Sequence, residues 1–167
     1  RDQAASATLC GACHDIVTGH GAAIERTFAE WKGSVFAQPG GATCGQCHME
    51  QSSTPKPVAP GGIERRIHGH TFAAVDLALT EFPEREDQSK RVNALLAKTL
   101  QTAICVGDDS RLSVMVDNVA AGHSFPSGSG PDRRLWFEVR AFKGADAIYE
   151  SGVLADGTSP ARSTDPD

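Results

Sequence analysis

Two copies of one five-residue pattern constrain this chain more than any other feature of its sequence. Residues 10–14 read Cys-Gly-Ala-Cys-His, and residues 44–48 read Cys-Gly-Gln-Cys-His. Two thiols three positions apart on a short helical turn can add to the two vinyl groups of one haem, and the following histidine lies under the iron as its proximal ligand. The sequence therefore predicts two covalently attached haem c groups. The thioether cysteines would be Cys10, Cys13, Cys44 and Cys47, and the proximal iron ligands would be His14 and His48.

A zinc site is the alternative interpretation of the four cysteines, because two Cys-x-x-Cys pairs are also the pattern of a zinc ribbon. That interpretation leaves His14 and His48 without a role. The chain has 6 His among 167 residues. A chance histidine after both pairs is then expected on the order of once in a thousand sequences. The histidines favour haem over zinc.

The composition predicts a thin protein core. Aromatic residues make up 6% of the chain, and Tyr occurs once. Two buried porphyrins would supply much of the missing apolar surface. Cys105 remains outside the haem motifs and is flanked by Ile104 and Val106, so we expect it to be a small buried hydrophobic residue rather than a reactive thiol.

The charge balance and the hydropathy exclude some partners. Lys plus Arg is 16 and Asp plus Glu is 21, which gives a net charge of −5. Nucleic acid is therefore not an expected partner. No apolar run approaches the roughly 20 residues that span a bilayer. The sequence starts at Arg1 without a signal peptide, which suits a processed chain. Because haem is attached in this way outside the bacterial cytoplasmic membrane, we expect an exported protein, periplasmic or extracellular.

The first hundred residues predict a small, loop-rich helical domain. A short helix is expected where Ile24, Phe28, Trp31 and Val35 recur at helical spacing, with Gly33 placed to end it. Residues 16–22 read as a flexible turn, and residues 51–62 read as a linker or an extended surface loop. A second helix is expected over residues 87–100, with Asp87 or Ser89 as its cap.

The pattern changes to alternating residues after that helix. Strands are expected over residues 101–106, 111–119, 134–142 and 146–152. The predicted class is therefore α+β, with a dihaem domain over residues 1–100 and an antiparallel β-sheet domain, a partial sandwich, over residues 101–167. One sheet of four strands would leave apolar rows exposed. We therefore expect the β-domain to be incomplete, or to be covered by other subunits or copies.

A long loop between the second and third expected strands carries the sequence Gly-His-Ser-Phe-Pro-Ser-Gly over residues 122–128. With residues 25–34, residues 44–49, His70 and Phe72, and the later Arg134-Leu135-Trp136, it resembles the multihaem c-type cytochromes related to the tetrahaem cytochrome of nitrifying bacteria. The resemblance covers most of residues 9–154. It is closest to a branch with few haems and a C-terminal β-domain bearing a Gly-His-x-Phe-Pro-x-Gly loop. It implies closely packed bis-histidine haems that transfer electrons, although this chain has only two haem motifs.

Two haems need two distal ligands, and four histidines remain for them. The resemblance matches His70 and His123, and the Gly and Pro content around His123 suits a fixed loop. His20 and His68 are the alternative distal ligands. His20 is too near His14 to fold over the same haem but could reach the other one.

Filled axial positions leave no place for a substrate, so the expected function is electron transfer rather than enzymatic catalysis. The redox partners would be other proteins or cytochromes, within a larger assembly or chain. The rival hypothesis is a multihaem oxidoreductase with an open haem that acts on a small nitrogen or sulfur compound. A haem sensor or a structural subunit is a third possibility.

Overall fold

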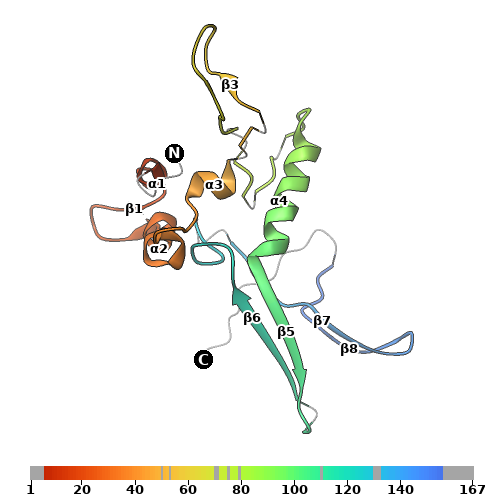
Figure 1. Cartoon of the computed structure of the whole chain (residues 1–167). Coiled ribbons are helices and arrows are strands. Elements are labelled where there is room, and N and C mark those ends of the chain that lie inside the picture. Colours follow the sequence, from red (N-terminus) through yellow and green to blue (C-terminus); the bar gives the residue numbers. More distant parts are fainter. Residues whose placement is uncertain are drawn as a thin grey trace. The chain divides into compact units, whose positions relative to one another are not determined.

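The structure is a computed structural model that describes residues 6–49, 51–52, 54–69, 72–74, 76–78, 80–109, 111–129 and 133–155. It has short helices and loops toward the N-terminus and antiparallel two-stranded hairpins later in the chain (Figure 1). The predicted α+β class is confirmed, and the described strands form no closed sheet. The chain divides into two compact units, Arg1–Gly128 and Ser129–Asp167. The expected domain boundary near residue 100 stays a prediction.

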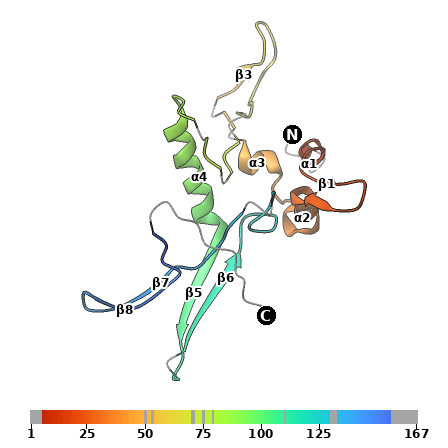
Figure 2. The same cartoon turned by 180° about the vertical axis from the view of Figure 1, so that it is seen from behind.

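Three short helices form the first part of the first unit. They are α1 (Ala7–Gly11), α2 (Thr27–Gly33) and α3 (Cys44–His48), and they lie together in both views (Figures 1 and 2). Phe28 of α2 sits so close to Gly11 that a Cβ added there would come within 2.6 Å of the Phe28 ring. The Phe28 ring also stacks on Trp31, with ring centroids 5.8 Å apart. Glycine at position 11 therefore lets α1 and α2 pack closely.

Trp31 is the one buried aromatic side chain among the described residues, and its indole N–H donates a hydrogen bond to the carbonyl of Ala42 at 2.9 Å. This bond ties α2 to the segment just before the second haem motif. The helix ends at Gly33 as predicted, but it is shorter than the periodicity suggested. Ile24 lies in a strand, and Val35 begins a 3₁₀ turn, η2 (Val35–Ala37).

Two small hairpins occupy segments that the sequence predicted to be loops. β1 (Ile16–Val17) pairs with β2 (Ala23–Glu25), and β3 (Lys56–Pro57) pairs with β4 (Glu64–Arg65). Residues 16–22 were expected to be a flexible turn and residues 51–62 a linker or an extended surface loop, so the strands within them were missed. Pairs this short carry no periodic signal, because the turn between the strands brings them together. The first hairpin matters for the site, since it places Glu25 immediately before α2.

The helix α4 (Arg85–Thr99) runs directly into β5 (Leu100–Val106), which pairs with β6 (Leu112–Asn118) (Figure 2). This helix and hairpin were predicted to within a few residues. The predicted caps were wrong, because Glu84 precedes the helix and Asp87 lies in its first turn. An acidic first turn suits the positive end of the helix dipole.

The second unit contains one described hairpin, β7 (Val139–Lys143) with β8 (Asp146–Ser151). The third expected strand was to begin at residue 134, but β7 begins at Val139. The described strands pair only two by two, so the expectation of one sheet with four strands was wrong. Gly144 at the turn has φ +64°, a conformation that favours glycine.

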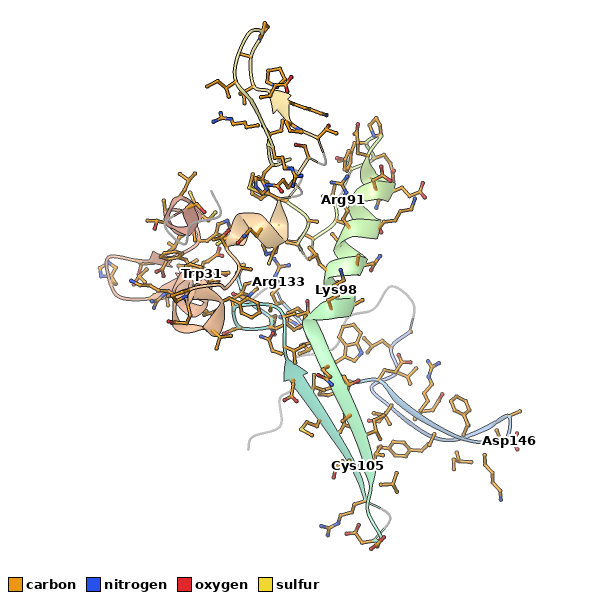
Figure 3. The ribbon with its side chains drawn as sticks, in the orientation of Figure 1. Trp31, Arg91, Lys98, Cys105, Arg133 and Asp146 are labelled. Atoms are coloured by element: carbon orange, nitrogen blue, oxygen red, sulfur yellow. The ribbon has the colours of Figure 1, made fainter. Side chains whose placement is uncertain are left out.

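Few apolar side chains are buried. Among the described residues the buried hydrophobic ones are Ala7, Trp31, Ala73 and Val92. Cys105 on β5 is exposed, so its expected burial was wrong (Figure 3). A two-stranded hairpin has no second layer to cover it, and so neither face of β5 is shielded. No helix in the described part of the chain is both long and apolar enough to cross a membrane.

Candidate functional site

The first haem motif begins on α1 and ends in the turn after it. The backbone N–H groups of Cys13 and His14 both donate to the carbonyl of Cys10, at 3.0 and 2.9 Å. This turn continues the helix and brings the two cysteines and the histidine close together along one short segment. Cys10 is half-buried and Cys13 is exposed.

The second haem motif is the whole of helix α3. Its start is fixed by the side chain of Gln46, whose Oε1 accepts a hydrogen bond from the backbone N–H of Thr43 at 2.7 Å. Gln46, which lies between the two cysteines of this motif, therefore has a structural role, because it satisfies a backbone donor at the helix N-terminus. Cys44 is half-buried, and Cys47 is exposed.

The first cysteines of the two motifs meet. Burial, followed by the neighbouring thiol of Cys10 and a hydrogen bond with it, raises the pKa of Cys44 to about 11. Helix α1 therefore places Cys10 beside Cys44 of α3. If both motifs bound haem, the first thioether positions of the two haems would be neighbours.

The predicted proximal histidine of the second motif faces the predicted distal histidine of the late loop. The rings of His48 and His123 have centroids 6.3 Å apart, and their planes are inclined by 18°. Two imidazoles that bind one metal from opposite sides through bonds of about 2 Å place their centroids roughly 6 Å apart. A pair of aromatic rings in ordinary contact also falls in this range of distance. The hydrogen bonds of the two rings show which nitrogen of each ring is free for a metal.

Both rings are held by a contact of Nδ1 with a backbone carbonyl oxygen, which leaves Nε2 for a metal. Nδ1 of His48 lies 2.7 Å from the carbonyl oxygen of Ala73, and Nδ1 of His123 lies 2.8 Å from that of Ser124. A carbonyl oxygen only accepts, so Nδ1 carries the hydrogen in each ring. The lone pair of the neutral imidazole is then on Nε2, where iron would bind. The pair fits a bis-histidine haem.

The loop that carries His123 is anchored at both ends. On one side the Asn118 side chain donates to the carbonyl of His123 at 2.7 Å. On the other side the carboxylate of Glu30 on α2 accepts from the backbone N–H of Ser124 at 3.2 Å and from the hydroxyl of Ser127 at 2.7 Å. Gly122 has φ +73° and lies against Phe36, so glycine is required there for conformation and space.

His14, the predicted proximal ligand of the first motif, is held in the same way but by a carboxylate. Its Nδ1 lies 2.9 Å from Oε1 of Glu25. Glu25, Glu30 and Ser127 lie in segments that carry the resemblance, but the sequence predicted no role for any of them. These contacts join residues far apart in the chain or in different elements, so no spacing in the sequence could have shown them.

The remaining histidines are His20, His68 and His70, and the structure describes two of them. Nδ1 of His68 lies 2.8 Å from the carbonyl oxygen of Met49, so its Nε2 is also available for a metal. His20 is exposed in the turn between β1 and β2. His70, one of the two preferred distal ligands, lies outside the described residues. The assignment of His70, with His20 and His68 as alternatives, stays a prediction.

Among the described residues, no three His, Cys, Asp or Glu side chains are close enough to hold one metal ion. No family model, no characterised protein and no solved structure matches this chain.

Proposed function

We propose that this protein is an exported dihaem c-type cytochrome, related to the multihaem cytochromes that it resembles in sequence, and that it transfers electrons. The observation that carries the proposal is the pairing of His48 with His123. Their ring centroids are 6.3 Å apart, and the Nδ1 of each ring is bound to a backbone carbonyl. Both features match two imidazoles that share one iron.

The attachment chemistry comes from the motifs. Cys44 and Cys47 on α3 would hold one haem, and Cys10 and Cys13 the other, through thioether bonds. A bound haem supplies an iron that changes oxidation state by one electron. His14 and His48 would bind the two irons on the proximal side. His70 would complete the first site, with His68 as the other candidate, whereas His20 is too near His14 for this site and could reach only the second haem.

The thin core also supports bound haem. Only four apolar side chains are buried in the described part of the chain. A porphyrin is a large apolar surface, and burying such surface contributes about 25 cal/mol per Å². Two haems beside α1, α2 and α3 would give these short helices a shared apolar centre that their own side chains do not provide.

Electron transfer follows from the ligands. If two histidines bound each iron, no ligand position would remain for a substrate, and the chemistry that the haem would supply is the gain and loss of electrons. Histidine in place of methionine as the distal ligand places the reduction potentials below those of His/Met cytochromes. The redox partners would be other cytochromes or redox proteins of the periplasm or the extracellular space.

Intact mass and haem staining test the attachment. The holoprotein expressed with its haem-attachment machinery should exceed the polypeptide mass by two haems and keep its haem stain after denaturation. A Cys44→Ala and Cys47→Ala double variant should lose one haem. A Cys105→Ser variant, which changes an exposed cysteine outside the motifs, should keep both. Bound zinc in place of haem would contradict the proposal.

A further inference from the structure

The two predicted proximal histidines have chemically different partners. His14 is hydrogen-bonded to the carboxylate of Glu25 at 2.9 Å. His48 is hydrogen-bonded to the neutral carbonyl of Ala73 at 2.7 Å. A carboxylate draws the Nδ1 hydrogen more strongly than a carbonyl does, because it carries a full negative charge. The imidazole of His14 is therefore the stronger electron donor at Nε2.

Glu25 is built into the structure and is not a mobile surface carboxylate. Its side chain is 19% exposed, whereas that of His14 is 59% exposed. The same oxygen that bonds to His14 also accepts a hydrogen bond from the hydroxyl of Thr27 at 3.0 Å. Limited contact with water leaves the charge of Glu25 only weakly screened.

The polar side chains around Glu25 extend to the loop of His123. The hydroxyls of Thr27 and Ser127 are 2.6 Å apart, and Ser127 donates to Glu30 at 2.7 Å. Glu30 also accepts from the N–H of Ser124, the residue after His123. Each hydroxyl has a single hydrogen, so Thr27 and Ser127 lie in contact while each donates to its own glutamate.

We propose that Glu25 lowers the reduction potential of the iron bound by His14 relative to that of the iron bound by His48. This inference rests on the proposed dihaem function. Stronger donation from the imidazole stabilises ferric iron over ferrous iron, and hydrogen bonds to the ligands are one of the means by which a protein sets this balance. In the dihaem protein this difference in potential would favour electron transfer toward the iron bound by His48.

Replacing Glu25 with glutamine in the holoprotein tests the proposal. Gln keeps the shape and an oxygen acceptor but loses the charge. In a spectroelectrochemical titration, the lower of the two potentials should rise and the gap should narrow. A roughly tenfold change in the ferrous-to-ferric ratio corresponds to about 59 mV for one electron. Glu86→Gln is the matched control, since it removes the same charge from an exposed position on α4 and should leave the gap unchanged.

A second variant tests the direction of the effect. Thr27→Val removes a donor that competes with His14 for the same carboxylate oxygen, so the lower potential should fall and the gap should widen. If Glu25 only supported the fold, Glu25→Gln and Thr27→Val would shift the lower reduction potential in the same direction.

Three outcomes would overturn the proposal. They are an unchanged gap in Glu25→Gln, a shift of the higher potential alone, or a rise of the lower potential in Thr27→Val. Failure of the proposed dihaem function would be a different result. It would be seen in the wild-type protein, which would lack covalent haem. Haem content and the low-spin spectrum are measured for every variant, so a change of ligation is distinguished from a change of potential.

Discussion

His48 and His123 belong to segments far apart in the chain, and their imidazole rings lie 6.3 Å apart with planes inclined by only 18°. One ring ends helix α3, and the other lies in the loop after β6. An iron between them would join these segments by two coordination bonds. In the proposed holoprotein, the loop after the β5–β6 hairpin is therefore part of the haem site.

Removing the imidazole of His123 should open one iron. His123→Ala is expected to keep both covalent haems, because the cysteines are untouched, and to convert one haem from low spin to high spin. Optical spectra of the ferric protein, with and without cyanide, measure this change. Cys105→Ser is the control and should retain two low-spin haems. An unchanged spectrum in His123→Ala would refute the ligand assignment and make His68 or His20 the candidate.

Weakening the anchor of the His123 loop should cost stability without removing a ligand. Ser127→Ala deletes the hydroxyl that donates to Glu30 at 2.7 Å, and a hydrogen bond to a charged group contributes about 1.5–3 kcal/mol. Thermal unfolding of the holoprotein should show a loss at the low end of that range, since the site is only partly buried. Ser113→Ala, on exposed β6, should have little effect. Equal melting of the two variants would contradict an anchoring role.

Gly11 should tolerate no side chain. A Cβ at this position would lie 2.6 Å from the Phe28 ring, and overpacking of this kind costs typically about 1–3 kcal/mol. Gly11→Ala should lower the unfolding temperature and separate α1 from α2. Gly19→Ala adds the same methyl group where no atom lies within 4 Å, and it should melt close to the wild type. A stable Gly11→Ala variant would show that α1 and α2 do not pack as described.

In the haem-free chain the Cys44 thiol should resist alkylation at neutral pH, because burial and the Cys10 thiol raise its pKa to about 11. Thiolate is the reactive form, so the alkylation rate should keep rising to about pH 11. The raised pKa also contributes to the free energy of unfolding. This contribution is fully present below the ordinary thiol pKa of 9.0, and it is lost as the pH rises through about 11. Cys10→Ala should shift the alkylation profile to lower pH. Mass spectrometry of Cys44 against pH gives the profile, and no shift in Cys10→Ala would contradict the contact.

The uncovered β5–β6 hairpin should promote association with other subunits or copies. Ile104 is 68% exposed on β5 and stands opposite Val114 of β6. Ile104→Lys should reduce self-association in sedimentation experiments, because a charge on an apolar strand opposes edge and face contacts. Gln101→Lys adds the same charge on the opposite face of the strand. A monodisperse wild-type monomer with a cooperative melt would refute this prediction.

The local parts of this fold were predictable from the sequence. Helix α4 has one apolar stripe, and β6 alternates Leu112, Val114 and Val116, so period alone located both. The pairing of whole segments was not predictable. The four expected strands near the C-terminus were predicted to form one sheet. The alternation of residues in a strand indicates which side chains share a face, but it does not indicate which strand is the neighbour.

The candidate site divides in the same way. The cysteines and the proximal histidines were read directly from two short motifs, and His123 was proposed from a resemblance. Glu25 was not predicted, because its role depends on the β1–β2 hairpin turning it toward His14. Ser127 and Glu30 likewise meet only through the folded loop. Sequence spacing reports contacts within one helix or strand, and these contacts cross between elements.

Low-temperature electron paramagnetic resonance of the resting ferric holoprotein tests the central claim most directly. Imidazole on both sides of each iron produces a strong ligand field, so the account predicts two low-spin ferric signals and no high-spin signal. The measurement uses the intact protein and needs no partner or substrate. A high-spin signal that accounts for one haem or more per chain would contradict the bis-histidine dihaem site and would indicate an iron open to a substrate.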